Sequence, residues 1–167
     1  GVQFSSLLGG FNTDRGNTVA LDKSENIFVV GCTFSNGNFE PTFFPISECA
    51  YDQLNRGGFD LFLTKLNPTA SRLMYSTMIG GQNNDYGSLA DYGRARIRLM
   101  GDSCNVEAII GMTSHSPDFP TTPGAFQPRK GNERDNGLED QPVLLKFKPY
   151  QLLQFRYDTT ACGVVQF

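Results

Sequence analysis

Ser114, His115, Ser116 and Asp118 bring a nucleophile, a base and a carboxylate into one short segment, and these are the residue types of a hydrolase triad. A catalytic triad is recognised by side chains that converge in space. Side chains of neighbouring loop residues fan out along the chain instead. We therefore predict that this segment is a structural loop, that the chain has no catalytic residues and that it is not an enzyme.

A second polar segment, Asp22-x-Ser24-x-Asn26, spaces oxygen-bearing side chains as a calcium loop does. It lacks the glycine and the closing bidentate glutamate of an EF-hand. Asp, Ser and Asn side chains also hydrogen-bond to the backbone amides of turns. We predict a turn of that kind here, and we expect neither a metal ion nor another cofactor.

The four cysteines, Cys32, Cys49, Cys104 and Cys162, lack the C-x-x-C spacing of a zinc site. Three pairings are open to them. Cys32 and Cys49 flank a single irregular loop, so we predict a disulfide between them if the compartment is oxidising. The alternative is two half-buried free thiols.

Composition and charge exclude several classes of protein. With 39% hydrophobic and 19% charged residues, the chain belongs to the folded globular proteins. A net charge of −3 without a Lys/Arg cluster argues against a nucleic-acid partner. No apolar run reaches the roughly 18–20 residues that cross a bilayer, so no transmembrane segment is expected.

An internal repeat sets the organisation of the chain. Residues 4–16 (FSSLLGGFNTDRG) and 75–87 (YSTMIGGQNNDYG) match at an offset of 75 − 4 = 71. We predict a first unit at 1–74, a second at 75–157, and the start of a next unit or module at 158–167. Within the repeated motif, Asp14 and Asp85 are expected to cap equivalent turns.

Alternating apolar and polar residues predict strands throughout both units. The expected strands are 2–8, 17–22, 27–33, 59–66, 72–79, 95–100, 106–113 and 141–147, with 152–157 opening a third copy. Matching Gly31 with Gly111 gives an offset of 111 − 31 = 80, which places about nine inserted residues at 88–94.

Four antiparallel strands per unit are the content of one β-propeller blade. The predicted fold is therefore all-β, with about two four-stranded antiparallel blades. Because propellers have about four to eight blades, two blades make an incomplete ring.

The motifs around these strands resemble the bacterial β-propeller repeat known as the SBBP repeat. The resemblance is carried by 114–127 (SHSPDFPTTPGAFQ), 75–81 (YSTMIGG) and 145–149 (LKFKP), and it extends to about residue 157. The first copy departs from the pattern at 38–53, where a longer loop contains Cys49. The second copy departs at 96–100, where RIRLM replaces the usual Ala-x-Asp.

One loop of this pattern is rich in aromatic residues and proline and is a candidate binding loop for a glycan or an extended peptide. Its residues, with one from the first copy, are Tyr51, Phe119, Pro120, Pro123 and Phe126. Since aromatic side chains carry a large apolar surface, we favour a role in anchoring the loop between blades.

The resemblance implies a non-catalytic segment of a large cell-surface or secreted protein of Bacteroidota-type bacteria, located outside the cell or on its outer surface. Its expected role is a structural or interaction scaffold, for adhesion or other protein contacts. The expected partners are the remainder of its own propeller, another protein subunit, or a glycan.

Two alternatives remain open. One is a carbohydrate-active or carbohydrate-binding propeller that uses carboxylates such as Asp22 and Asp60, although the second copy has Gln141 where the first has Asp60. The other is a component of a surface motility or secretion apparatus that docks on an outer-membrane complex.

Overall fold

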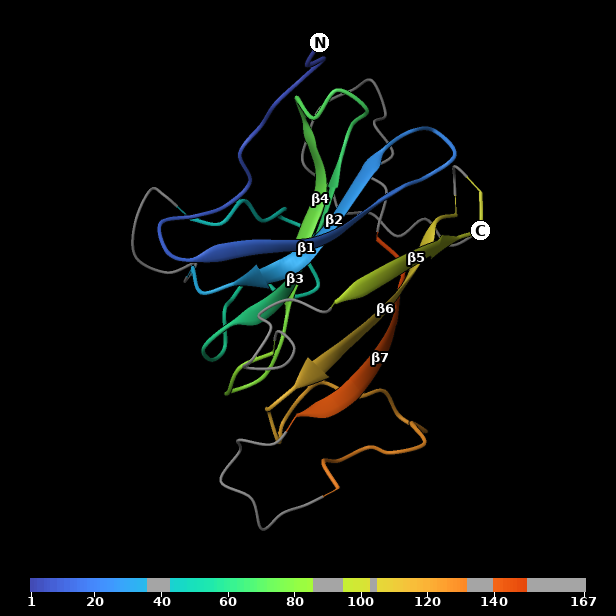
Figure 1. Cartoon of the computed structure of the whole chain (residues 1–167). Helices are drawn as coiled ribbons and strands as arrows, with labels where there is room; N and C mark the ends of the chain where they lie inside the picture. The colour runs from blue at the N-terminus through green and yellow to red at the C-terminus, as the bar shows by residue number, and fades with distance from the viewer. Residues whose placement is uncertain (36–42, 86–94, 103–104, 132–139, 150–167) are drawn as a thin grey trace.

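The computed structural model describes residues 1–35, 43–85, 95–102, 105–131 and 140–149. In these residues the chain is all-β, as predicted, with seven strands and no helix (Figure 1). The strands are β1 (Asp14–Leu21), β2 (Ile27–Thr33), β3 (Asp60–Leu66), β4 (Leu73–Ile79), β5 (Arg96–Met100), β6 (Glu107–Ser114) and β7 (Gln141–Phe147). They form a first sheet in the order β1-β2-β3-β4 and a second sheet in the order β5-β6-β7.

Both sheets are antiparallel meanders, in which each strand pairs with the next one along the chain. Short polar turns connect β1 to β2 and β3 to β4, and this local connection favours antiparallel neighbours. The four-stranded first sheet and the three described strands of the second are compatible with partial blades of a β-propeller-like fold.

The strand predicted at 2–8 is not formed. Val2, Phe4 and Leu7 are exposed, and residues 1–10 have no regular structure. The matching segment of the second copy does form β4, because β3 lies directly before it and offers a backbone ladder. A strand needs such a partner for its N–H and C=O groups, and alternation alone does not supply one.

The unit boundary predicted between residues 74 and 75 falls inside β4, which completes the first sheet. The sequence repeat and the sheets are thus out of phase by one strand. The expected strand at 152–157, the segment 158–167 and the insertion at 88–94 lie outside the described residues.

Strand pairing shows which positions of the two sheets are equivalent. Lys65 and Lys146 match in sequence at an offset of 146 − 65 = 81. Lys65 pairs with Phe28 and Lys146 with Ile109, so β2 and β6 match at the same offset, 109 − 28 = 81. The predicted match of Gly31 with Gly111 is therefore wrong by one residue. A shift of one residue would turn every side chain to the opposite face of the sheet.

The edge strands β1 and β5 follow a different offset. Leu21 pairs with Ile27, and Leu99 pairs with Ala108, which gives 99 − 21 = 78. The second copy therefore has 78 − 71 = 7 additional residues before β5 and 81 − 78 = 3 in the following hairpin turn.

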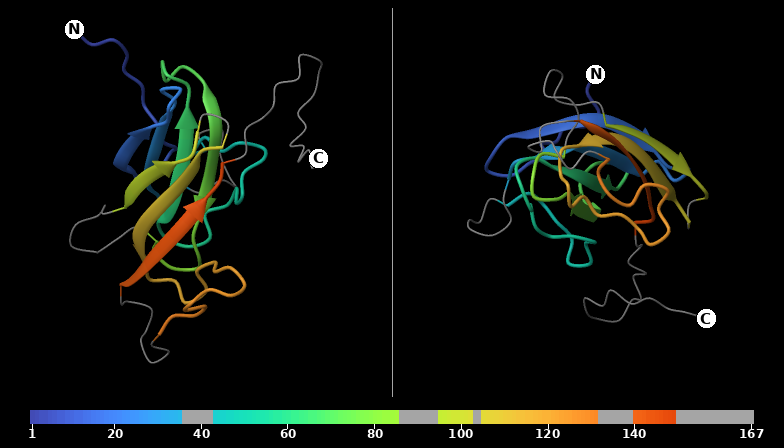
Figure 2. Two further views of the ribbon diagram at one scale, coloured as in Figure 1. Left: turned by 90° about the vertical axis from the view of Figure 1, so that its right-hand side faces the viewer. Right: turned by 90° about the horizontal axis from the view of Figure 1, so that it is seen from below.

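The two sheets stack face to face as two layers (Figure 2), and most of the core lies between them. We call the two facing surfaces the inner faces and the opposite surfaces the outer faces. The first sheet contributes Phe28, Val30, Leu61, Leu63 and Ile79 to this core, and the second sheet contributes Ala108, Ile110 and Met112.

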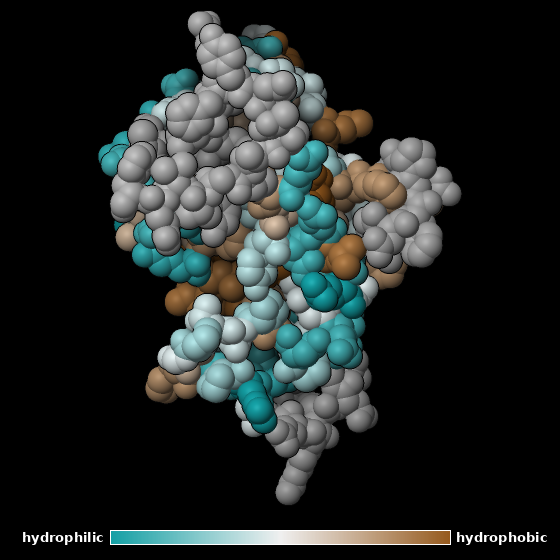
Figure 3. Space-filling model, turned by 180° about the vertical axis from the view of Figure 1, so that it is seen from behind, coloured by the Kyte–Doolittle hydropathy of each residue, from teal (hydrophilic) through white to brown (hydrophobic). Residues whose placement is uncertain are grey.

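Part of the outer face of the first sheet is also covered. Phe62 and Met78 pack there against Phe44, with Leu8 and Ile46 nearby. Seen from behind, the described surface carries separate hydrophobic areas between hydrophilic ones (Figure 3).

Residues 47–52 run along β4, the edge strand of the first sheet, and we call them the strap. The Ser47 amide donates to the Ser76 carbonyl (3.1 Å), and the Met78 amide donates to the Asp52 carbonyl (3.0 Å). The Asp52 amide donates to Thr77 Oγ1 (3.0 Å). These bonds use polar groups that an open edge would expose to pairing with another chain.

Candidate functional site

Two equivalent carboxylates, Asp14 and Asp85, each gather the same set of hydrogen bonds, and we call these arrangements the aspartate knots. In the first knot, the Gly10 amide donates to Asp14 Oδ2 (2.7 Å). Thr33 Oγ1 and Ser35 Oγ donate to Asp14 Oδ1 at 2.5 and 3.1 Å. A carboxylate that accepts several bonds ties the Gly-Gly turn to the end of β2.

The second knot repeats this pattern. The Gly81 amide donates to Asp85 Oδ2 (2.7 Å), Ser116 Oγ donates to the same oxygen (2.8 Å), and Ser114 Oγ donates to Oδ1. Ser114 and Ser116 stand 81 residues after Thr33 and Ser35, the offset that strand pairing gives. Both copies therefore build the same knot from the same positions.

The second glycine of each Gly-Gly pair lies close to a knot serine. A Cβ atom on Gly10 would lie 2.7 Å from the Cβ of Ser35, and one on Gly81 would lie 2.6 Å from the Cβ of Ser116. Side chains do not approach each other so closely, so any larger residue would push the turn away from the knot.

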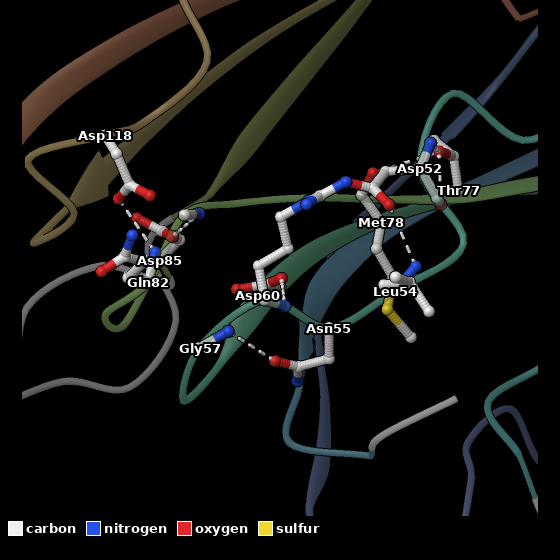
Figure 4. A network of polar contacts seen from close by, with 12 residues as sticks. Asp52, Leu54, Asn55, Gly57, Asp60, Thr77, Met78, Gln82, Asp85 and Asp118 are labelled. Carbon is white, nitrogen blue, oxygen red and sulfur yellow. Dashed lines mark hydrogen bonds and ion pairs between the residues drawn. The ribbon is translucent and has the colours of Figure 1, made fainter. Parts of the chain in front are cut away.

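Asp60, at the start of β3, is a third carboxylate close to the second knot (Figure 4). It is 0% exposed. Its Oδ2 accepts the Arg56 amide (2.8 Å), and its Oδ1 has no hydrogen-bond partner among the described residues. A Cβ atom on Gly80 would lie 2.3 Å from that Oδ1, so only glycine fits beside it.

Burial raises the pKa of Asp60 to about 8, because removal from water penalises the charged form. The Arg56 amide acts against this shift, while the nearby charges of Asp85 and Asp52 add to it. Burial also raises the pKa of Asp85, and its bonds from Ser114, Gly81 and Ser116 oppose that effect. Asp60 is therefore protonated at neutral pH, and it is closed off from solvent.

The candidate triad residues do not converge as a nucleophile and base. Ser114 and Ser116 direct their hydroxyls to Asp85, and His115 Nε2 pairs with Asp140. Asp118 accepts the Gln82 amide (2.9 Å). These serines therefore act as hydrogen-bond donors to a structural carboxylate.

The turn predicted around Asp22 is confirmed. Asp22 Oδ1 accepts the amides of Ser24 and Asn26, both at 2.9 Å, and the Asn26 side chain donates to Oδ2 (2.9 Å). Lys65 Nζ lies 3.2 Å from Asp22 Oδ2 in a buried ion pair. Burial raises the pKa of Asp22, but the bonds from Asn26, Lys65 and Ser24 outweigh it and leave the pKa below its usual value.

The five residues of the candidate binding loop lie in different surroundings. Phe119 is half-buried and packs against the core, as an anchoring role requires, whereas Pro123 and Phe126 are exposed. Pro120 is half-buried. Tyr51 lies in the strap, and its exposed ring meets Phe147 edge-on at 6.0 Å.

The predicted disulfide between Cys32 and Cys49 is wrong. Cys32 is a free thiol in the buried part of β2, and burial raises its pKa to about 11. Cys49 is disulfide-bonded, but not to Cys32. Cys32 lies within a strand packed on both sides, whereas Cys49 lies in the strap at the sheet edge, so flanking the same loop does not bring the two sulfurs together.

Sequence reasoning missed the state of Asp60 and the serine partners of the knots. The sequence did contain a signal for the knots. Two hydroxyl residues separated by one position lie at the end of the second strand of each hairpin, Thr33 and Ser35 in the first copy and Ser114 and Ser116 in the second, and the two sets are 81 residues apart. No sequence signal distinguishes Asp60 from an exposed strand-end aspartate.

Among the described residues, no group of three or more His, Cys, Asp and Glu side chains could hold a metal ion. The same part of the chain contains no helix that is long and apolar enough to cross a membrane. Comparisons with protein-family models, curated proteins and solved structures find no match to this chain. The resemblance to the SBBP repeat therefore stays a prediction from its motifs.

Proposed function

We propose that this chain is a non-catalytic β-propeller segment that acts as a structural or interaction scaffold in an extracellular or surface-exposed bacterial protein. The observation that carries the proposal is the duplicated aspartate knot. The residue types that could do chemistry, Ser114 and Ser116 above all, donate to a buried carboxylate that holds a turn, and the first copy uses Thr33 and Ser35 for the same purpose.

The disulfide at Cys49 supports the proposed location. Disulfides form and persist in oxidising compartments such as the cell exterior and the periplasm, and they are rare in the cytosol. The free thiol Cys32 does not conflict with this location, because its burial and raised pKa protect it from oxidation.

Location is tested by protease treatment of intact cells of the source bacterium. We expect the protein to be degraded while a cytoplasmic marker stays intact, and Cys49 to be alkylated only after reduction. A protein that is protected until the cells are lysed would contradict the proposed location.

The non-catalytic role is tested with a fluorophosphonate probe, which labels activated serine nucleophiles. We expect no labelling of the purified chain, because Ser114 and Ser116 face Asp85 and not an imidazole. Labelling that disappears in Ser114→Ala or Ser116→Ala would overturn the non-catalytic role.

Glycan binding is a second candidate function, favoured by the exposed aromatic rings of Phe126 and Tyr51. Aromatic side chains with one open face are common in recognition surfaces. A glycan array with the purified chain tests it. Binding that is lost in Phe126→Ala or Tyr51→Ala would support this candidate, and an array without signal would reject it.

A further inference from the structure

The outer face of the first sheet is built from the same positions as the inner face of the second sheet. One row across the first sheet's outer face joins Val19, Val29 and Thr64. Val29 packs against the cluster around Phe44 and Thr64 is 0% exposed, so Val19 is the open end of this row. The equivalent row on the second sheet is Ile97, Ile110 and Leu145. That second row packs against the first sheet, so positions of this kind form a sheet-binding face.

The next row shows the same relation. It joins Leu21, Ile27 and Leu66 on the outer face of the first sheet. Its equivalents on the second sheet are Leu99, Ala108 and Phe147, which pack in the core between the sheets.

The outer face of the second sheet in turn corresponds to the inner face of the first. Arg98, Ile109 and Lys146 form a row there. The equivalent row on the first sheet is Ala20, Phe28 and Lys65. The second sheet covers the row of Ala20, Phe28 and Lys65. No element of the described residues covers the row of Arg98, Ile109 and Lys146, in which Arg98 and Lys146 are exposed.

The inner face of the first sheet and the outer face of the second sheet each carry a lysine paired with an acidic residue. Lys65 pairs with Asp22 (3.2 Å), and the two side chains are 3% and 1% exposed. Lys146 pairs with Glu107 (2.7 Å), with exposures of 58% and 33%. The two lysines are equivalent, whereas the acids come from different positions, since Glu107 matches Asn26 by the offset 107 − 26 = 81. The second pair is much more exposed than the first.

Apolar side chains remain exposed on both outer faces. On the first sheet, Val19 and Leu21 are 61% and 60% exposed. On the second sheet, Leu144 is 78% exposed and Met100 is 44% exposed. Exposed aliphatic residues on positions that are otherwise buried mark an interaction surface.

We infer that the open part of the first sheet's outer face, along β1, is a docking surface for a second copy of this chain, which presents the outer face of its second sheet. The contact would continue the interface between the two sheets within one chain, because it joins the same two kinds of face. It is a head-to-tail contact, since each copy uses two different surfaces. The arginine side chains beside Leu144 can lay their aliphatic stems over Val19 and Leu21 with their charges in water.

The inference deepens the proposed scaffold function and rests on it. Sedimentation velocity over a concentration series of the full chain tests it. One variant, Val19→Lys with Leu21→Lys, changes the first face, and another, Met100→Lys with Leu144→Lys, changes the second. All four residues are exposed, so the fold should tolerate the changes, and circular dichroism checks this. Phe126→Lys, on an exposed loop outside both faces, is the matched control.

We expect the wild type and Phe126→Lys to associate reversibly with similar dissociation constants. The dissociation constant of each face variant should be at least about tenfold higher than that of the wild type. An equimolar mixture of the two face variants should form a heterodimer that does not grow further, because each variant keeps one intact face.

Three outcomes would overturn the inference. A wild type that stays monomeric at every soluble concentration would do so. Association of the Met100→Lys, Leu144→Lys variant at wild-type strength would show that two first sheets meet instead. A mixture that does not form a heterodimer would exclude the head-to-tail arrangement. None of these outcomes bears on the protease and probe experiments, so the scaffold function would stand or fall separately.

Discussion

At the residue scale, Asp60 carries an ionisable group that the fold encloses completely. Its equivalent in the second copy is Gln141, since 60 + 81 = 141, and Gln141 cannot ionise. The raised pKa of Asp60 keeps its carboxyl neutral at neutral pH, and the amide of Gln141 is neutral at every pH. Neither copy therefore holds a charge at the start of β3 or β7 at neutral pH. A carbohydrate-active site needs an acid that a substrate can reach, and the Asp60 side chain is enclosed in the described structure.

Asp60 makes the stability of the protein depend on pH in an unusual direction. Its pKa is about 8 in the folded state, against 3.8 for a free aspartate side chain. The stability associated with this group is therefore fully present below about pH 3.8 and is lost as pH rises towards 8, by up to about 1.4 kcal/mol per pH unit.

We expect Asp60→Asn to remove this loss and to raise the free energy of unfolding at alkaline pH by at least about 2 kcal/mol over the wild type. Urea unfolding between about pH 5 and 9 measures it, with the exposed Glu48→Gln as control. If the two variants followed the same pH profile, Asp60 would have to be ionised in the folded protein.

The two aspartate knots differ in burial, and this predicts different costs for removing them. Asp85 is 0% exposed, whereas Asp14 is only part-buried. Asp85→Ala leaves the Gly81 amide and two serine hydroxyls without an acceptor, at a cost of about 3 kcal/mol. We expect a smaller loss for Asp14→Ala, measured by urea unfolding, because water can replace its carboxylate. Equal losses would show that burial does not determine the cost.

At the element scale, the same strand position carries a buried ion pair in β3 and an exposed one in β7. Lys65→Met would leave Asp22 charged in a buried place, which costs about 3–5 kcal/mol. Lys146→Met removes an exposed partner of Glu107 and should cost less than about 1 kcal/mol. Thermal unfolding of both variants compares them directly, and a cost for Lys146→Met as large as that for Lys65→Met would mean that β7 is covered in solution.

The strap gives the long segment between β2 and β3 a structural role. It supplies hydrogen bonds to Ser76, Thr77 and Met78 along the edge of β4. An antiparallel sheet with an unprotected edge can pair with other chains, so the first sheet is protected on this side.

At the scale of the whole molecule, the two sheets differ in how much of their surface is covered. The first sheet is packed on its inner face and partly on its outer face, where Phe62 and Met78 meet Phe44. The second sheet alternates buried and more exposed residues along β6, so the described residues pack its inner face alone. The first sheet is therefore the more stable part of the described structure.

Hydrogen exchange of the native protein tests this difference. We expect amides of β3 to exchange at least about tenfold more slowly than those of β6, since both are central strands of their sheets and differ in packing. The measurement should be made at a dilution where the protein is monomeric, because docking of a second copy would cover the outer face of β6. Equal protection would show that the two sheets open as one unit.

The sequence by itself determined the seven described strands, their antiparallel order and the repeat. Alternating residues at 59–66 and 141–147 predicted β3 and β7, because a strand with one buried face leaves that pattern in any context. The turn at Asp22 was equally accessible, since its bonds run between residues two to four apart in the chain.

Only the tertiary structure decided which segments found partners. Residues 2–8 have the pattern of a strand but no neighbouring ladder, whereas the equivalent β4 has β3 beside it. The disulfide, the knot serines and the protonated Asp60 depend in the same way on groups that are distant in sequence and close in space. The residues that could do chemistry, Ser114, His115 and Ser116, are held apart for this reason: each meets an aspartate that the fold, and not the local sequence, brings to it.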